Sequence, residues 1–254
     1  MKPLTIVTSW NRLDCTKRML TSLEPSLDAL QTIIVDNGSE LETVAWLTDW
    51  AEHKDVELIA LPQNVGCPRA LNVALEHRSP GQDVIKLDND LLLPDSNDWI
   101  RGIERLVDHA ERQREPIAMI GACYDTFSDR RIRQEVTWEG EKLYIVYPLI
   151  GHAVYHSGRF MDEAGYFDVL SPEHIYGFED NLISAKAAIL GWPMVVWTGW
   201  QIRDIQRHSA LGGKDAVSEH VAAMRPLYEL RLHYYLGGGP LHTGPDGYPK
   251  RRTT

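Results

Sequence analysis

The chain has 254 residues, of which 43% are hydrophobic and 24% are charged, and its net charge is −10. The length suits one large α/β domain, or a domain with a small appended lobe. The net acidity argues against a protein whose whole surface binds a polyanion, since such proteins carry a basic footprint. The sequence contains no run of about 18 apolar residues, so we expect no membrane span.

The N-terminus and the cysteines bear on the location of the protein. The first residues, MKPLTIVTSWNR, enter a strand-like run at once and include no secretory hydrophobic region. Cys15, Cys67 and Cys123 are widely scattered and form no CxxC pair, which favours reduced thiols over a disulfide framework. We therefore expect a cytoplasmic protein.

Strand-like and helical segments alternate through the first half of the chain. The expected strands cover residues 4–8, 32–35, 56–61, 84–87 and 117–121, and the expected helices cover residues 11–23, 41–53, 68–77 and 97–114. This alternation predicts a mainly parallel sheet with helices on both faces.

After residue 121 the pattern changes. We expect a hairpin around Glu139-Gly140, a short helix and turn in RFMDEAGYFD, and a helix that Gly191 closes before a last strand. The final stretch, GGGPLHTGPDGYPKRRTT, is rich in Gly and Pro, which is typical of a mobile tail or a lid.

Polar residues follow four of the expected strands. They occupy positions 8–12, 36–37, 64–69 and 88–90. In an open parallel sheet, ligands bind outside the carboxyl ends of the strands. The sequence therefore predicts an active site at this edge.

Asp88 and Asp90 interrupt the apolar stretch DVIKLDNDLLLPD. In an extended segment, residues two positions apart point to the same side, and two adjacent carboxylates repel unless a cation or a proton lies between them. Mg²⁺ and Mn²⁺ commonly use one or two carboxylates together with a diphosphate. A turn that ends a strand explains this tripeptide almost as well, so both interpretations stay open at this point.

Other polar residues also have two interpretations. Glu179 and Asp180 at an expected helix start can stabilise the helix or act as a general base. Arg69, at a loop-to-helix junction, can be a surface charge or a phosphate contact, and no GxGxxG or GxxxxGK[ST] loop offers another phosphate site. His208 can be a surface residue or a ligand.

Six stretches, taken in order, resemble the GT-A glycosyltransferases, in particular family 2. They are LTIVTSWNR, TIIVDNGS, NVGCPRALNVAL, IKLDNDLLLP, MDEAGYFD and GFEDNLISAKAAILGWPMVVW, and they extend over residues 4–198. The resemblance implies a Rossmann-like GT-A fold with a central, mostly parallel sheet flanked by helices and a smaller C-terminal acceptor-side region. It implies one domain over residues 1–236, with a nucleotide-sugar-binding half at 1–121 and an acceptor-side half at 122–236, and a tail at 237–254.

The resemblance also implies roles for individual residues. The donor, which we expect to be a UDP sugar or another nucleoside-diphosphate sugar, would contact Thr8, Asn11, Arg12, Asp36, Asn64, Arg69 and Asp88. Asp90 and Asp88 would bind Mn²⁺ or Mg²⁺, with His208 as an extra ligand. Asp180, or otherwise Glu179, would deprotonate the acceptor hydroxyl as it attacks the anomeric carbon, with inversion.

The acceptor stays open between a saccharide, a lipid-linked molecule and a small molecule. The Q-x-x-R-W motif and membrane helices of processive synthases are missing, so we expect transfer of a single sugar. A second hypothesis is transfer to a hydroxymethylated DNA base, which the basic cluster at 130–133 permits and the net acidity disfavours. A third hypothesis is a non-catalytic sugar-nucleotide-binding protein. The sequence disfavours it, because the chain keeps all four candidate acidic residues, Asp88, Asp90, Glu179 and Asp180.

Overall fold

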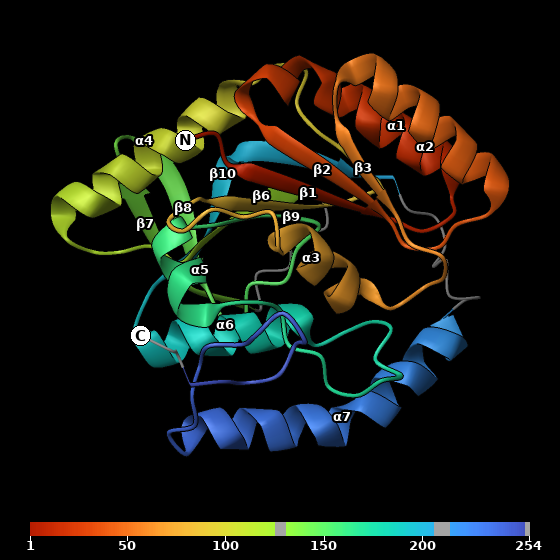
Figure 1. Ribbon diagram of the computed structural model, residues 1–254. Coiled ribbons are helices and arrows are strands. Elements are labelled where there is room, and N and C mark those ends of the chain that lie inside the picture. Colours follow the sequence, from red (N-terminus) through yellow and green to blue (C-terminus); the bar gives the residue numbers. More distant parts are fainter. Residues whose placement is uncertain (125–130, 206–213, 252–254) are drawn as a thin grey trace.

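A sheet with the strand order β3-β2-β1-β4-β9-β6-β10-β8-β7 runs through the molecule, and helices cover both of its faces (Figure 1). The computed structural model describes residues 1–124, 131–205 and 214–251. This architecture confirms the α/β class expected from the sequence.

The first half of the sheet is parallel. Its strands are β1 (Leu4–Ser9), β2 (Gln31–Asp36), β3 (Glu57–Ala60) and β4 (Val84–Asp88). The connecting segments are α1 (Leu13–Leu23), the 3₁₀ helix η1 (Glu24–Ala29), α2 (Leu41–Lys54) and α3 (Cys67–Leu75). Thr8 of β1 is paired with Val35 of β2 on one side and with Asp88 of β4 on the other, so the carboxyl ends of these strands meet at one edge.

The second half of the sheet is mixed. Strand β9 (Ala153–His156) lies between β4 and β6 (Met119–Tyr124) and is antiparallel to both, and β10 (Met194–Asp204) is parallel to β6. The predicted hairpin is confirmed as β7 (Ile132–Trp138) and β8 (Glu141–Val146), and β8 pairs with β10. The short strand β5 (Leu91–Leu92) pairs with the end of β10.

Each face of the sheet carries its own hydrophobic core. Helices α1, α2 and α4 (Asp98–Gln113) cover one face, where Trp99 stacks on Trp200 with ring centroids 4.9 Å apart. Helices α3, α5 (Gly158–Ala164) and α6 (Glu179–Leu190) cover the other face (Figure 1). Because side chains alternate along a strand, Ile33 and Ile34 of β2 enter different cores.

The C-terminal part of the chain packs against α6. Helix α7 (Lys214–Leu236) places Met224 and Tyr235 in a small core with Leu182 of α6. The described part of the Gly- and Pro-rich segment, 237–251, returns to the body, where the Thr243 amide donates to Ala164 O and the Val169 amide donates to Gly247 O. Neither β9 nor α7 is among the elements expected from the sequence.

Candidate active site

A cleft of about 540 Å³ opens at the carboxyl ends of β1 and β4, beside the start of α6. Its walls come from segments that are far apart in the sequence. They include the end of β1, the loop before α3, the β4–β5 turn, the segment before β9, the loop that enters α6 and the first turn of α7. The charged and titratable side chains that line it include Arg12, Lys86, Asp88, Asp90, His152, Glu179 and Asp180. The edge predicted from the sequence therefore carries a cleft rich in charge.

Asp88, Asp90 and His152 form a cluster in this cleft. Strand β4 ends at Asp88, and Asp90 follows in the turn after it. His152 directly precedes β9, and its carbonyl accepts a hydrogen bond from the Asp88 amide at 2.8 Å. His152 Nδ1 lies 3.1 Å from Asp88 Oδ2 and 3.5 Å from Asp90 Oδ1. The hydrogen bonds with Asp88 and Asp90 raise the pKa of His152 to about 11.

This donor set suits a divalent cation. The three ligand atoms lie within 4.8 Å of one another, and they come from two carboxylates and one imidazole. Carboxylate oxygens are preferred by Mg²⁺ and Mn²⁺, and an imidazole nitrogen suits a transition metal better than Mg²⁺. The residues present therefore fit a bound dication.

Arg12 is the second cationic partner of Asp90. Asn11 and Arg12 both adopt left-handed backbone conformations, with φ of 53° and 55°, just before α1 begins. The Arg12 guanidinium donates from Nη1 to Asp90 Oδ2 at 2.9 Å. Burial acts to raise the pKa of Asp90, but His152 and Arg12 outweigh it, so the pKa lies below the ordinary value and the carboxylate is ionised.

Lys86 connects the carboxylates on the two sides of the cleft. Its Nζ lies 3.1 Å from Asp180 Oδ1 and 3.7 Å from Asp88 Oδ1, and its side chain is only 3% exposed. Burial acts to lower the pKa of Lys86, but Asp180 and Asp88 outweigh it and keep the amine protonated. A fixed positive charge therefore lies between the two acidic groups.

Glu179 and Asp180 occupy the first turn of α6, behind Phe178, which has a φ of 67°. Burial, followed by the charge of Asp180, raises the pKa of Glu179 to about 7. Burial also raises the pKa of Asp180, against the opposing effect of Lys86. The two neighbours thus differ in their partners, because Lys86 is hydrogen-bonded to Asp180 and not to Glu179.

Residues 5–162 match the sequence profile described as Glycosyl transferase family 2, which is more than half of the chain. The chain belongs to glycosyltransferase family 2. No curated protein matches it at a significant level. Among the described helices, none combines the length and the apolar character that a membrane span requires.

Solved structures of glycosyltransferases share the GT-A fold of this chain. The S. aureus TarS 1–349 complex with UDP-GlcNAc aligns with a TM-score of 0.65 and 17% identity, over 91% of this chain and 66% of that one. A mannosyltransferase from Pyrobaculum calidifontis, in complex with GDP-Man and Mn²⁺, aligns with a TM-score of 0.63 and 20% identity, over 92% and 68%. GalNAc-T7 with UDP, GalNAc and Mn²⁺ aligns with a TM-score of 0.65 and 15% identity, and this chain spans 50% of its length.

Most of the residues that the resemblance to family 2 singled out lie together in the cleft. These are Thr8, Arg12, Asn64, Asp88, Asp90, Glu179 and Asp180. Asn64 is held by Asn37, whose Nδ2 donates to Asn64 Oδ1 at 3.0 Å. His208, expected as an extra metal ligand, lies outside the described residues.

Asn11, Asp36 and Arg69 are placed beside the cleft, in contacts with the backbone. The Asn11 side chain accepts the Glu40 amide, and one oxygen of the buried Asp36 carboxylate accepts the Ser39 amide at 3.0 Å. The Arg69 guanidinium donates to the carbonyls of Val65, Ser171 and Pro172 at 2.7 to 3.1 Å. These contacts order the loops around the cleft, and donor contacts by these three residues stay a prediction.

Sequence reasoning did not single out Lys86 or His152. Lys86 carried a usable signal, because in a strand it shares a face with Asp88, and a lysine is rare in a buried parallel strand. His152 carried no such signal, because it reaches Asp88 only through the pairing of β9 with β4. Two aromatic residues, Tyr176 and Trp10, also line the cleft, and neither was assigned a role in the site from the sequence, although Trp10 lies within the stretch LTIVTSWNR.

Proposed function

We propose that this glycosyltransferase moves one sugar from a nucleoside-diphosphate sugar, most simply a UDP sugar, to an acceptor hydroxyl with inversion at the anomeric carbon. The observation that carries the proposal is the joint presence, in one cleft, of the Asp88–Asp90–His152 cluster and the Glu179–Asp180 pair. The TarS complex with UDP-GlcNAc and the mannosyltransferase complex with GDP-Man and Mn²⁺ support a donor of this class.

The donor side of the reaction is assigned to residues 1–121, together with His152 from the second half of the chain. Thr8, Arg12 and Asn64 line the part of the cleft that the parallel strands form, and we assign them to the nucleotide. Asp88, Asp90 and His152 would hold Mn²⁺ or Mg²⁺, which when bound stabilises the negative charge that develops on the leaving diphosphate.

The acceptor side is assigned to residues 122–236, with the segment 237–254 as a tail. Asp180 is the base: one of its carboxylate oxygens takes the proton of the acceptor hydroxyl while the hydroxyl oxygen bonds to the anomeric carbon and the bond to the diphosphate breaks. The buried setting of Asp180 raises its pKa and so makes it a better base. Glu179 is the alternative base.

A ligand panel on the purified chain tests the donor class. Thermal unfolding is recorded with UDP-glucose, UDP-GlcNAc and GDP-mannose, each with and without Mn²⁺, because binding to the native state raises the melting temperature. We expect a shift for one nucleotide class that depends on Mn²⁺. If none of the donors shifts the melting temperature with the metal present, the proposed donor class is wrong.

Two variants separate the metal site from the base. Asp90→Asn should abolish Mn²⁺-dependent binding of the nucleotide in calorimetry, whereas Asp246→Asn, which removes a carboxylate from a surface ion pair, should leave binding unchanged. Asp180→Asn should bind the donor normally and lose sugar transfer by about 100-fold or more. Full turnover by Asp180→Asn would move the role of base to Glu179.

A further inference from the structure

Lys86 is a buried cation at a position where a parallel strand normally carries an apolar residue. It lies in the middle of β4, its Nζ is 3.1 and 3.4 Å from the two oxygens of Asp180, and it is 3.5 Å from Gly151 O. Its other carboxylate partner, Asp88, is 3.7 Å away. Transferring an ammonium group out of water is strongly unfavourable unless charged partners offset the loss.

The contacts of Lys86 distinguish the two neighbouring acids of α6. Asp180 receives both hydrogen bonds from the ammonium group, while Glu179 Oε2 is buried and has no hydrogen-bond partner among the described residues. Both residues line the cleft, and both are buried. The positive charge therefore stabilises the ionised form of Asp180 in particular and fixes the direction of its carboxylate.

We propose that Lys86 is a positioning residue for sugar transfer, which holds the Asp180 carboxylate in the orientation that accepts the proton of the acceptor hydroxyl. The inference rests on the proposed function of Asp180. In the transfer step the proton goes from the acceptor hydroxyl to a carboxylate oxygen of Asp180, and Lys86 keeps its own proton throughout. Lys86 acts through Asp180 and does not touch the reacting atoms.

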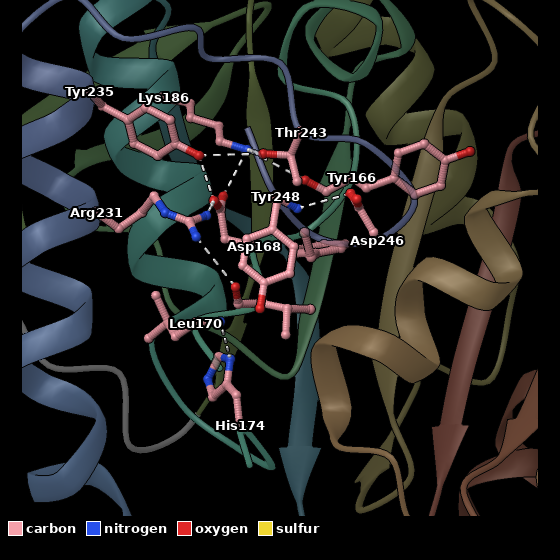
Figure 2. Close-up of polar contacts among 12 residues, drawn as sticks. Tyr166, Asp168, Leu170, His174, Lys186, Arg231, Tyr235, Thr243, Asp246 and Tyr248 are labelled. Carbon is pink, nitrogen blue, oxygen red and sulfur yellow. Dashed lines mark hydrogen bonds and ion pairs between the residues drawn. The ribbon is translucent and has the colours of Figure 1, made fainter. Parts of the chain in front are cut away.

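A second buried lysine provides the matched control. Lys186 of α6 is fully buried and lies 2.8 Å from Asp168 Oδ2, and its Nζ also donates to Thr243 Oγ1 at 2.7 Å (Figure 2). Arg231 and Tyr235 of α7 reach the same Asp168 carboxylate (Figure 2). None of these residues lines the cleft, so this network joins α6 to α7 and to the C-terminal segment without reaching the site of transfer.

The two lysines should therefore respond differently to removal of their charge. In Lys86→Met we expect kcat for release of nucleoside diphosphate from the donor to fall by about 100-fold, while KM for the donor changes by less than about threefold. Lys86→Arg, which keeps the charge, should recover about a tenth or more of the wild-type kcat. Lys186→Met should lower the melting temperature and keep the wild-type kcat per folded molecule.

A double-mutant cycle shows whether Lys86 acts through Asp180. Once Asp180→Asn has removed the base, adding Lys86→Met should not lower the residual rate further, because the residue that Lys86 positions is already gone. Independent, multiplicative losses would overturn the inference, since they would mean that Lys86 acts on the donor or on Asp88. The double variant removes both charges together, so it leaves no unpaired buried ion if Lys86→Met alone does not fold.

The assay uses UDP-glucose, UDP-GlcNAc and GDP-mannose with Mn²⁺, and it counts the nucleoside diphosphate released with water as the acceptor. A wild-type chain that is inactive on all three donors overturns both the proposed function and the inference. A wild-type chain that is active, together with Lys86→Met at the wild-type kcat, overturns the inference alone. A fall in kcat that is equal in Lys86→Met and Lys186→Met also overturns it, because both would then report only the loss of a buried ion pair.

Discussion

The Arg12 guanidinium lies 2.9 Å from Asp90 Oδ2, so an arginine of the β1–α1 loop already neutralises a carboxylate of the candidate metal site. A dication at Asp90 has to share this carboxylate with Arg12 or to displace it. If the cation displaces it, the arginine would be free to contact the diphosphate of the proposed donor. On the proposed function, this ion pair would couple binding of the metal to binding of the nucleotide at Asp90.

We expect Arg12→Gln to bind Mn²⁺ about tenfold more tightly than the wild-type chain when no nucleotide is present, which corresponds to about 1.4 kcal/mol. The reason is the loss of a competing positive charge beside Asp90. Isothermal titration calorimetry with MnCl₂ measures this. Arg18→Gln, an exposed change on α1 with the same loss of charge, should have no effect. Weaker Mn²⁺ binding by Arg12→Gln would mean that Arg12 organises the site instead of competing with the cation.

Arg69 is the predicted donor contact whose observed bonds favour a different role. It donates to three backbone carbonyls on two loops, one before α3 and one before α6. We expect Arg69→Met to lower the free energy of unfolding by about 3 kcal/mol, because three backbone carbonyls, two of them in part-buried contacts, lose hydrogen bonds from a charged donor. Urea unfolding followed by circular dichroism measures this loss.

The affinity of Arg69→Met for UDP and Mn²⁺ should stay within about threefold of the wild-type value, because the guanidinium points at the loops. A tenfold or larger loss of affinity that weakens at high salt would instead establish a contact with the phosphates. This comparison decides between the predicted contact and the loop anchor.

The parallel half of the fold was accessible from the sequence, because local signals determine it. The alternation of apolar strands with amphipathic helices, and the Gly and Pro residues between them, predicted β1 to β4 in order. Strand β9 was not predicted because it has only four residues and is buried on both faces, so its sequence does not alternate between polar and apolar residues. Helix α7 was not predicted because its apolar residues do not form one stripe along the helix and because a proline lies within it.

The site residues that could be found from the sequence are those whose positions depend on local sequence. Asp88 and Asp90 follow a strand directly, and Glu179 and Asp180 begin a helix, so their positions could be read from the chain. His152 joins the aspartates only through strand pairing across more than sixty positions of sequence, which no local pattern encodes. Long-range pairing is the physical reason that His152 was missed, whereas Lys86 lies in the same strand as Asp88 and its signal was local.

Gly66 should be far less tolerant of a side chain than Gly140, although both adopt positive φ, at 92° and 80°. A Cβ on Gly66 would lie 2.2 Å from His174 O, whereas one on Gly140 meets nothing within 4 Å. We expect Gly140→Ala to cost about 1 kcal/mol of unfolding free energy through backbone strain alone. Gly66→Ala should cost about 3 kcal/mol, because the backbone itself must move.

The same change at Gly66 should weaken donor binding. The Cys67 amide donates to Ile175 O at 2.7 Å, and both residues line the cleft together with Tyr176. Displacing this contact changes the shape of the cleft wall. Equilibrium urea unfolding and UDP–Mn²⁺ calorimetry on both alanine variants test the prediction. Equal losses at the two glycines would show that the approach of His174 does not constrain the loop.

His156 should make the protein sensitive to acid. It is the buried last residue of β9, between β4 and β6, and its ring meets Phe167 edge-on. Neither ring nitrogen has a hydrogen-bond partner among the described residues. Burial, with a smaller effect from the charge of Lys86, lowers the pKa of His156 from 6.5 to about 3. The folded chain therefore holds this imidazole neutral, while the unfolded chain protonates it below pH 6.5.

The sign of the effect follows from this difference. Because the folded pKa lies below the unfolded one, the contribution of His156 to stability is complete above pH 6.5 and is lost as the pH falls from there toward 3. The loss amounts to about 1.4 kcal/mol for each pH unit in that window. Replacing His156 with leucine removes the titrating group and keeps an apolar side chain of similar volume in the core.

We therefore expect the wild-type chain to lose stability faster than His156→Leu as the pH is lowered from about 6 to about 4. The unfolding free energy of the wild-type chain should fall, relative to that of the variant, by about 1.4 kcal/mol for each pH unit. Urea unfolding of both proteins over this range measures it. All other titrating groups are common to the two chains, so the subtraction isolates His156. Parallel pH profiles would contradict the prediction, because they would mean that His156 takes up a proton in the folded state as readily as in the unfolded one.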